Sequence, residues 1–224
     1  MLITISRQYG AGASEVARRV AEALGWSVVD NEIVGQVAFR AGLSPDEVAE
    51  RDERCPGFVE RLARTLATSS QEMFVPAAAS DADLEEGDLV RITERVVEEI
   101  ALQGRAVVIG RAAAAVLGQQ ERVLHVRIVA PKALRIRTVM ERLGVDRKRA
   151  EQLVDDTDAH RARYHREYYH RDWDDPTLYH MILNTGALGL DGAAELVLAR
   201  ARRLGWGGPP DPGREAQPKP NPLP

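Results

Sequence analysis

The amino-terminal segment constrains the fold most, because an apolar run, a glycine-containing turn and a helical pattern follow one another directly. Leu2–Ile5 reads L-I-T-I, residues 6–14 read S-R-Q-Y-G-A-G-A-S, and a helical pattern opens at Glu15. In such a turn, glycines let backbone N–H groups converge on an anion, and the helix N-terminus adds a partial positive charge. The segment therefore predicts a strand, a phosphate-binding loop and a helix, in that order.

This loop lacks the lysine that usually follows its second glycine. The pattern G-x-x-x-x-G-K-[ST] would carry lysine where this chain has Ala13, and Ser14 stands at the Ser/Thr position. The hydroxyl of Ser14 suits Mg²⁺, although a helix N-cap is an equally good interpretation. The residues expected to surround the phosphates of a nucleotide are Ser6, Arg7, Gln8, Tyr9, Gly10, Ala11, Gly12, Ala13 and Ser14.

Arg7 is the candidate that replaces the missing charge, because a guanidinium binds phosphate bidentately. An ordinary surface arginine is the competing interpretation. A hydrogen bond to a charged group contributes about 1.5–3 kcal/mol, so losing one such contact costs roughly 10- to 150-fold in affinity or rate. A loss of that size would slow a phosphoryl transfer without abolishing nucleotide binding.

Composition excludes several classes of protein. The chain has 224 residues, a net charge of −4 and one cysteine, so it lacks the basic stripe of a nucleic-acid-binding protein and cannot form an intrachain disulfide. We see no signal peptide and no apolar stretch near the roughly 20 residues of a membrane span. These features favour a cytoplasmic protein without membrane or nucleic-acid partners. Residues 206–224 hold seven of the twelve prolines and are expected to be a disordered tail.

Short apolar runs alternate with helical patterns over residues 1–205, which predicts one α/β domain. The expected strands are Leu2–Ile5, Ser27–Val29, Ala106–Ile109, Val123–Val129 and Tyr179–Leu183. The expected helices are Ser14–Leu24, one after a capping box at Ser44, 58–73, 87–103, one opened by Pro131, one started by Asp146 and one capped by Asp191. Five strands separated by helices indicate a parallel sheet.

Two further segments place polar residues at the carboxyl ends of strands, where open α/β sheets bind ligands. Val107–Arg111 ends in Gly-Arg, and Arg111 suits a second phosphate group such as that of an acceptor; an ordinary helix-start arginine is the alternative. Asp30 follows the second strand and could hold an acceptor nucleoside, although a helix N-cap fits it at least as well.

A long polar helix after Asp146 favours a lid that closes over phosphate. It carries several arginines and aromatic residues, and Asp158 and Arg161 are i, i+3 neighbours on one face. A solvated surface helix is the plainer alternative. His160, His165 and His170 recur every five residues, which is not a metal-ligand spacing, and we interpret them as non-ligands.

Taken together, these segments resemble the cytidylate kinase-like family, a branch of the P-loop nucleoside monophosphate kinases. The pieces are residues 3–26 with S-R-Q-Y-G-A-G, V-V-D-N-E-I, V-V-I-G-R, A-P-K-A-L-R-I-R-T-V-M-E-R and the D-x-x-R-x-x-Y of the lid, across about residues 2–185. The resemblance implies a three-layer P-loop NTPase fold with a five-stranded parallel sheet. It also implies a helical acceptor-binding insert at about 31–103, a helical lid at about 145–175, and phosphoryl transfer from ATP with Mg²⁺ to a nucleoside monophosphate such as CMP.

Carried over by position, Gly10, Gly12 and Ser14 would cradle the donor phosphates, and Arg111 would meet the acceptor phosphate. The arginines that would neutralise the transferring phosphoryl group are Arg135, Arg137, Arg161 and Arg163, with Arg7 in the loop. Family members with full activity carry lysine at the position of Ala13, so this chain follows a divergent form of the loop.

We expect a phosphotransferase that acts on a nucleoside monophosphate or a similar small phosphate acceptor, with small-molecule nucleotides as its partners. Two alternatives stay open. Ala13 favours a non-catalytic nucleotide sensor, and the helical insert with the proline-rich tail favours a partner-binding protein. A homodimer is compatible with either.

Overall fold

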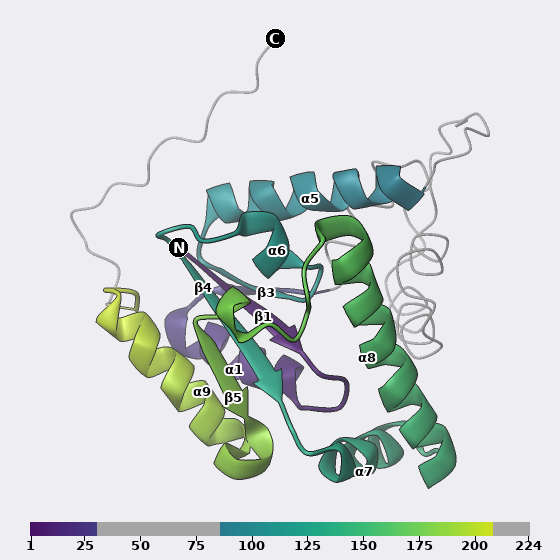
Figure 1. The fold of residues 1–224 in the computed structure, drawn as a ribbon. Helices are drawn as coiled ribbons and strands as arrows, with labels where there is room; N and C mark the ends of the chain where they lie inside the picture. The colour runs from purple at the N-terminus through teal and green to yellow at the C-terminus, as the bar shows by residue number, and fades with distance from the viewer. Residues whose placement is uncertain (31–85, 208–224) are drawn as a thin grey trace, which may run out of the picture.

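The computed structural model describes residues 1–30 and 86–207 (Figure 1). The capping box at Ser44, the expected helix at 58–73, most of the expected insert and nearly all of the proline-rich tail lie outside the described residues.

A five-stranded parallel sheet forms the centre of the molecule (Figure 1). Its strands are β1 (Leu2–Arg7), β2 (Ser27–Val29), β3 (Ala106–Ile109), β4 (Val123–Val129) and β5 (Met181–Asn184). The spatial order is β2-β3-β1-β4-β5, and every pair is parallel. This confirms the expected fold class and puts β1 at the centre, so the loop that follows it leaves from the middle of the carboxyl edge.

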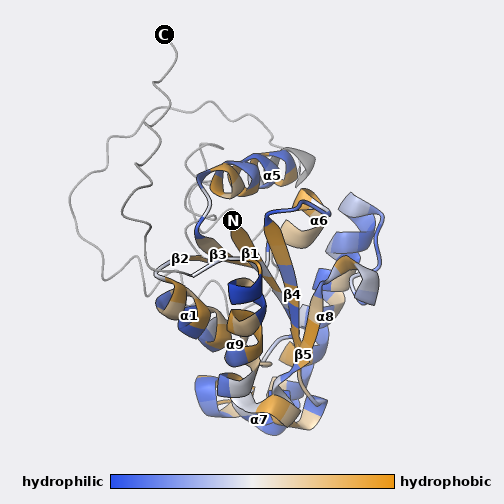
Figure 2. Ribbon diagram, turned by 90° about the vertical axis from the view of Figure 1, so that its left-hand side faces the viewer, coloured by the Kyte–Doolittle hydropathy of each residue, from blue (hydrophilic) through white to orange (hydrophobic). Residues whose placement is uncertain are grey.

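The side chains of β1 alternate between two layers, as the period of a strand requires. Ile3 and Ile5 pack in the cluster shared with α1 (Ala13–Leu24) and α9 (Thr185–Arg203). Leu2 packs on the opposite face, with α5 (Glu86–Gln103) and α6 (Ala113–Leu117). Helices therefore cover both faces, and apolar strands lie between helices that turn polar surface outward (Figure 2).

The remaining helices lie at the carboxyl end of the sheet, where α7 (Lys132–Leu143) packs against α8 (Arg147–Tyr169) (Figure 1). Their starts were expected: Pro131 directly precedes α7, and the Asp146 carboxylate caps α8 by accepting a hydrogen bond from the Arg149 amide at 2.8 Å. Within the range expected for the lid, about 145–175, lies α8, a 23-residue helix, followed by a loop.

Three local predictions were wrong. The last strand begins at Met181 rather than Tyr179, because the Tyr179 hydroxyl bonds to the Trp173 carbonyl at 2.9 Å and holds that residue in the preceding loop. The final helix starts earlier than expected and is capped by Asn184, and it breaks at Gly189 (φ 69°). Asp191 does not cap it and instead pairs with Arg19 at 2.6 Å. The short helix α6 was not expected.

Candidate functional site

The loop between β1 and α1 is held by side chains of other elements that bind its carbonyls. Arg161 Nη1 donates to the Arg7 carbonyl at 2.9 Å, and Arg135 Nη1 donates to that of Tyr9 at 3.2 Å. The Thr185 hydroxyl donates to the Ala11 carbonyl at 2.9 Å. In a trans peptide the carbonyl and the next N–H point in opposite directions. The amides after Tyr9 and Ala11 therefore face away from these donors, as a phosphate-binding loop requires.

Gly10 and Gly12 are required in this loop by conformation and by space. Both have positive φ, at 79° and 80°, which side-chain-bearing residues rarely adopt. A Cβ on Gly10 would lie 2.7 Å from the Arg135 carbonyl oxygen, and one on Gly12 would collide with the Leu190 side chain. The loop thus cannot keep this path with alanine at either glycine.

The neighbouring loop residues comprise a partly buried support, a buried core residue and an exposed hydroxyl. The backbone N–H of Gln8 donates to the Ile128 carbonyl, and its side-chain oxygen accepts from the backbone N–H of Ala130. Gln8 therefore holds the loop against the end of β4. Ala13 is 4% exposed and packs in the core. Ser14 is exposed in the first turn of α1. Gly12 is the N-cap, so the interpretation of Ser14 as an N-cap was wrong.

A carboxylate of α8 already accepts a hydrogen bond from one backbone amide of the loop. Asp158 Oδ1 accepts from the Tyr9 amide at 2.8 Å, and its Oδ2 pairs with Arg135 Nη1 at 2.6 Å. Arg161 Nη1 lies 3.9 Å from the same carboxylate, which confirms the expected neighbours on one helix face. Arg135 also donates to the Ala130 carbonyl, so its guanidinium is a support of the loop.

Arg7 turns from the loop toward β2 and β3. Its Nη2 lies 3.7 Å from Asp30 Oδ1, and its guanidinium lies so close to Gly110 that a Cβ there would overlap Nη1. Gly110 has φ 76°. The arginine expected to replace the missing lysine therefore lies on the side of the loop that faces Arg111.

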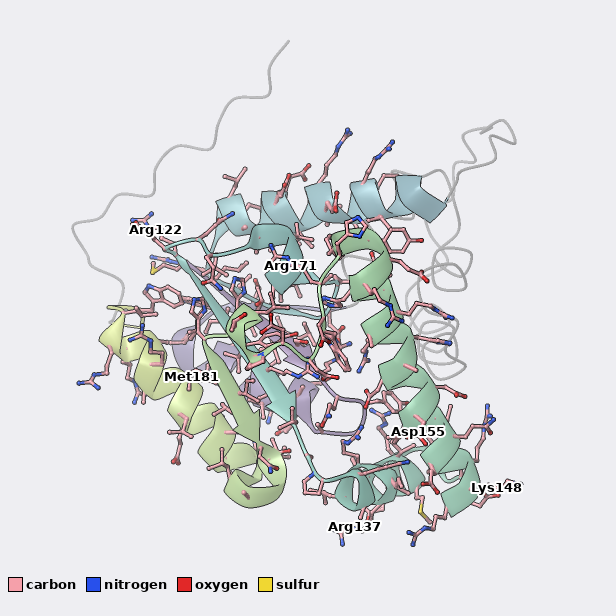
Figure 3. The ribbon with its side chains drawn as sticks, in the orientation of Figure 1. Arg122, Arg137, Lys148, Asp155, Arg171 and Met181 are labelled. Carbon is pink, nitrogen blue, oxygen red and sulfur yellow. The ribbon has the colours of Figure 1, made fainter. Side chains whose placement is uncertain are left out.

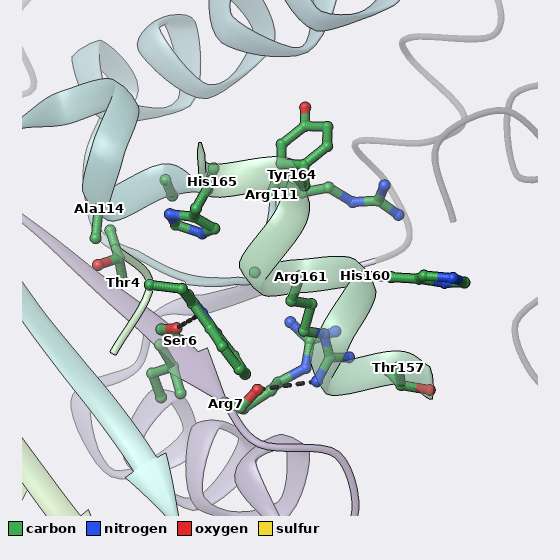
Figure 4. A pocket seen from close by; sticks show the side chains of 15 residues that line it. Thr4, Ser6, Arg7, Arg111, Ala114, Thr157, His160, Arg161, Tyr164 and His165 are labelled. Carbon is green, nitrogen blue, oxygen red and sulfur yellow. Dashed lines mark hydrogen bonds between the residues drawn. The ribbon is translucent and has the colours of Figure 1, made fainter. Parts of the chain in front are cut away.

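A pocket lies between α8, α6 and the ends of β1 and β3 (Figure 4). Three of the predicted arginines line it, namely Arg7, Arg111 and Arg161. Arg111 adopts a left-handed conformation with φ 56°. Its pKa falls to about 10, first because it is buried and then because Arg7 and Arg161 are near, while Asp30 opposes the shift. Arg111 still carries its charge at neutral pH, so the pocket concentrates positive charge from three separate elements.

Two predicted arginines lie elsewhere. Arg137 and Arg163 are exposed, and neither is among the described residues that line the pocket. Figure 3 shows Arg137 on the outer side of α7. Their helical positions explain this, because each lies two residues from a buried or pocket-facing arginine, which on a helix is a different face.

Sequence reasoning missed the aromatic and imidazole side chains of the pocket. Five side chains of α8 line it, namely Thr157, His160, Arg161, Tyr164 and His165. Their spacing of i, i+3, i+4, i+7 and i+8 marks one helix face and was readable in the sequence. The interpretation of the histidines rested on the five-residue interval alone.

Thr4 of β1 was a second missed signal, and Ser6, which was expected beside the nucleotide phosphates, lines the same pocket. Thr4 and Ser6 alternate with core residues and line the pocket, although a strand buried in a parallel sheet is usually apolar throughout. Trp173 comes from the loop after α8, and its indole N–H donates to Ser6 Oγ at 3.0 Å. Arg127 holds this loop in place, because its guanidinium donates a hydrogen bond to the Trp173 carbonyl and forms an ion pair with Asp174.

The described residues offer few ligands for a metal. No group of three or more His, Cys, Asp or Glu side chains within residues 1–30 and 86–207 could hold an ion by itself. An ion at this site would be held chiefly by the phosphates of a nucleotide and by water, and the exposed hydroxyl of Ser14 fits that role because Mg²⁺ usually keeps several waters. In the same described ranges, no helix is long and apolar enough to cross a bilayer.

Some solved structures have a fold similar to that of this protein. An uncharacterised protein from Eubacterium ventriosum has a TM-score of 0.64 at 21% identity, with 90% of this chain and 98% of that chain covered. Shikimate kinase from Bacteroides thetaiotaomicron has a TM-score of 0.50 at 11% identity, with the same coverage of 90% and 98%. At these identities the likeness concerns the fold alone.

Relatives with closer sequences are proteins described as cytidylate kinases. That of Aeropyrum pernix is 29% identical over 206 residues, which cover 90% of this chain and 99% of the relative. That of Natronomonas pharaonis is 26% identical over 201 residues, which cover 88% and 87%. The model of the cytidylate kinase-like family matches residues 2–187. This match spans most of the chain, and the protein therefore belongs to the cytidylate kinase-like family, with a kinase as its coarse activity class.

Proposed function

We propose that this protein is an ATP-dependent phosphotransferase that acts on a nucleoside monophosphate, CMP or a close analogue, or on a similar small phosphate acceptor. One observation carries the proposal: Arg7, Arg111 and Arg161 line a single pocket beside the glycine loop at the carboxyl edge of the sheet. A cationic pocket next to a phosphate-binding loop suits two phosphate groups that must meet. The family membership and the archaeal relatives support the same activity class.

The proposal divides the work between the loop and the arginines. Backbone amides of the loop and the N-terminus of α1 bind the phosphates of ATP. Arg111 binds the phosphate of the acceptor, and Arg161 lies between the loop and the pocket, where charge develops on the transferring group. Phosphoryl transfer depends mainly on positioning and on such electrostatic stabilisation, and guanidinium groups held in fixed positions can supply both.

Arg7 and Arg161 together replace the charge of the missing lysine in this proposal. Arg161 Nη1 is anchored on the Arg7 carbonyl, so its guanidinium is fixed next to the loop. Arg7 is oriented by Asp30. Arg135 braces the loop through the Tyr9 carbonyl and Asp158, and we assign it a positioning role.

Mg²⁺ completes the donor site in this proposal. Ser14 would be its protein ligand, and the ion would shield charge on the phosphates of ATP. The residues of the chain contribute the rest: loop amides orient the donor, and the arginines orient the acceptor.

The test is ADP release in a coupled assay with ATP, Mg²⁺ and each common nucleoside monophosphate. We expect turnover with at least one, and a loss of about 10- to 150-fold in kcat/KM for Arg111→Ala and Arg161→Ala, since each removes a charge-assisted contact. Arg137→Ala is the matched control, because it removes an exposed arginine outside the pocket, and it should keep full activity. If purified protein binds ATP but turns over no acceptor, the nucleotide-sensor alternative replaces this proposal.

A further inference from the structure

The pocket continues past the three arginines to a second, inner end of different chemistry. Figure 4 shows Arg7, Arg161 and His160 on one side and Thr4, Ser6, Ala114 and His165 on the other. Apolar or small side chains also line the pocket, from Ile5 and the run Ala112–Ala114, together with Trp173.

We propose that His165 and Ser6 form a subsite for an uncharged hydrogen-bonding group of the phosphate acceptor and so determine which acceptor is used. The inference rests on the proposed function, because it takes Arg111 to bind the acceptor phosphate, with Arg7 and Arg161 around the transferring group beside it. It adds the orientation of the acceptor: phosphate toward Arg7, Arg111 and Arg161, and the neutral part of the molecule toward the inner end.

His165 is a buried polar side chain with unused capacity. It is 6% exposed, it lines the pocket, and no described residue makes a hydrogen bond to its Nδ1. Native proteins leave few buried polar atoms in this state, because each costs about 1–3 kcal/mol, and the exceptions often mark functional sites. A ligand group, reached by a small rotation of the ring, would supply the partner.

The imidazole of His165 is neutral at physiological pH. Burial lowers its pKa to about 4, and the charges of Arg127 and Arg171 act in the same direction. A neutral ring can donate from one nitrogen and accept at the other, so it matches a hydroxyl, carbonyl or amino group better than it matches an ion.

Ser6 supplies a hydroxyl to the same pocket. Its oxygen accepts the Trp173 indole N–H at 3.0 Å, and the Tyr179 hydroxyl lies 3.4 Å from it, a longer contact that competes only weakly with a ligand group for the Ser6 hydroxyl. Thr4 is already used, because its hydroxyl donates to His125 Nδ1 at 2.7 Å while His125 Nε2 donates to the Gly118 carbonyl. The inner end therefore presents one hydroxyl and one imidazole.

The surroundings select against a charged group. The described residues that line the pocket include no carboxylate that could pair with a cation. An anion would be desolvated between alanines and an indole, and it gains more at the arginines. A phosphate monoester with a compact, neutral, polar body fits both ends at once.

The experiment measures the binding of CMP, ribose 5-phosphate and inorganic phosphate by calorimetry to the full chain and three variants. His165→Leu removes the hydrogen bonds and keeps an apolar side chain, His165→Gln keeps a neutral donor and acceptor, and His170→Asn is the control. His170 is exposed on the same helix and has φ 52°, a conformation that asparagine tolerates.

We expect His165→Leu to weaken CMP binding about 10-fold while phosphate binding is unchanged, and His165→Gln to recover part of the loss. Without ligand, His165→Leu should melt at the same or a higher temperature, because it removes a buried polar atom that has no partner. His170→Asn should match the parent protein in both measurements. A parallel loss for ribose 5-phosphate assigns the contact to the sugar, and an unchanged value assigns it to the base.

A second measurement follows the His165 ring of the parent protein directly. In protein with ¹⁵N-labelled histidine, saturating CMP should move the imidazole resonances of His165, identified by their absence in His165→Leu. Unmoved resonances, or equal CMP affinity in the parent and His165→Leu, overturn the inference while leaving the proposed function intact. If the parent protein binds phosphate but neither CMP nor any other nucleoside monophosphate, the proposed function fails as well.

Discussion

The carboxylate of Asp158 links α8 to the phosphate-binding loop, and its removal should destabilise the whole fold. It bonds the Tyr9 amide at 2.8 Å and pairs at 2.6 Å with Arg135, whose side chain is 8% exposed. Removing one member of a buried ion pair costs about 3–5 kcal/mol, because the other charge stays buried without its partner. The Asp158 side chain is 18% exposed and Arg135 keeps two carbonyl partners, so we expect a cost at or below the lower limit of that range, about 2–3 kcal/mol for Asp158→Ala.

Urea denaturation followed by circular dichroism measures this free energy of unfolding. For a chain of this size the loss corresponds to a fall in melting temperature of roughly 4–12 °C. Asp156→Ala is the control, since Asp156 is an exposed acid on the same helix and should change stability by less than about 0.5 kcal/mol. A double-mutant cycle with Arg135→Met should give a coupling energy of at least about 1 kcal/mol. If Asp158→Ala unfolds at the same urea concentration as Asp156→Ala, the carboxylate does not hold α8 on the loop.

Three further outcomes follow from individual contacts. Gly110→Ala should cost about 1–2 kcal/mol through its positive φ and displace the Arg7 guanidinium, so that kcat/KM falls in the ADP-release assay. Thr4→Val should cost about 1–3 kcal/mol in urea denaturation, because His125 Nδ1 loses its buried donor; a change below about 0.5 kcal/mol, the size expected of a surface substitution, contradicts this. Burial lowers the pKa of His125 and lowers that of His165 to about 4, so the unfolded chain binds more protons and stability falls as pH drops from about 6.5 toward 4. Melting temperatures from pH 7.5 to 4.5 check this, and His165→Leu should make their decline shallower.

The loop illustrates what local sequence determines. An apolar strand, two glycines that need positive φ and a helix start within residues 2–24 specify a phosphate-binding turn by short-range rules alone. The alternation of such units along the chain then predicted the parallel sheet, since parallel strands need crossover helices.

The arginines illustrate what those rules could not decide. Arg161 and Arg163 look equivalent in sequence, yet the first binds the Arg7 carbonyl and the second is exposed. The difference depends on which face α8 turns to the sheet, and that face is set by the packing of Leu153 and Val154 against α7.

The sequence by itself therefore determined the fold class, the phosphate-binding loop and the presence of excess guanidinium charge, because each depends on neighbours within one turn or one strand. Only the tertiary structure decided which charges meet, that Asp158 occupies a loop amide and that His165 lies buried in the same pocket as Ser6. Those contacts join residues about 150 positions apart, and their geometry follows from how helices dock on the sheet, which no local pattern encodes.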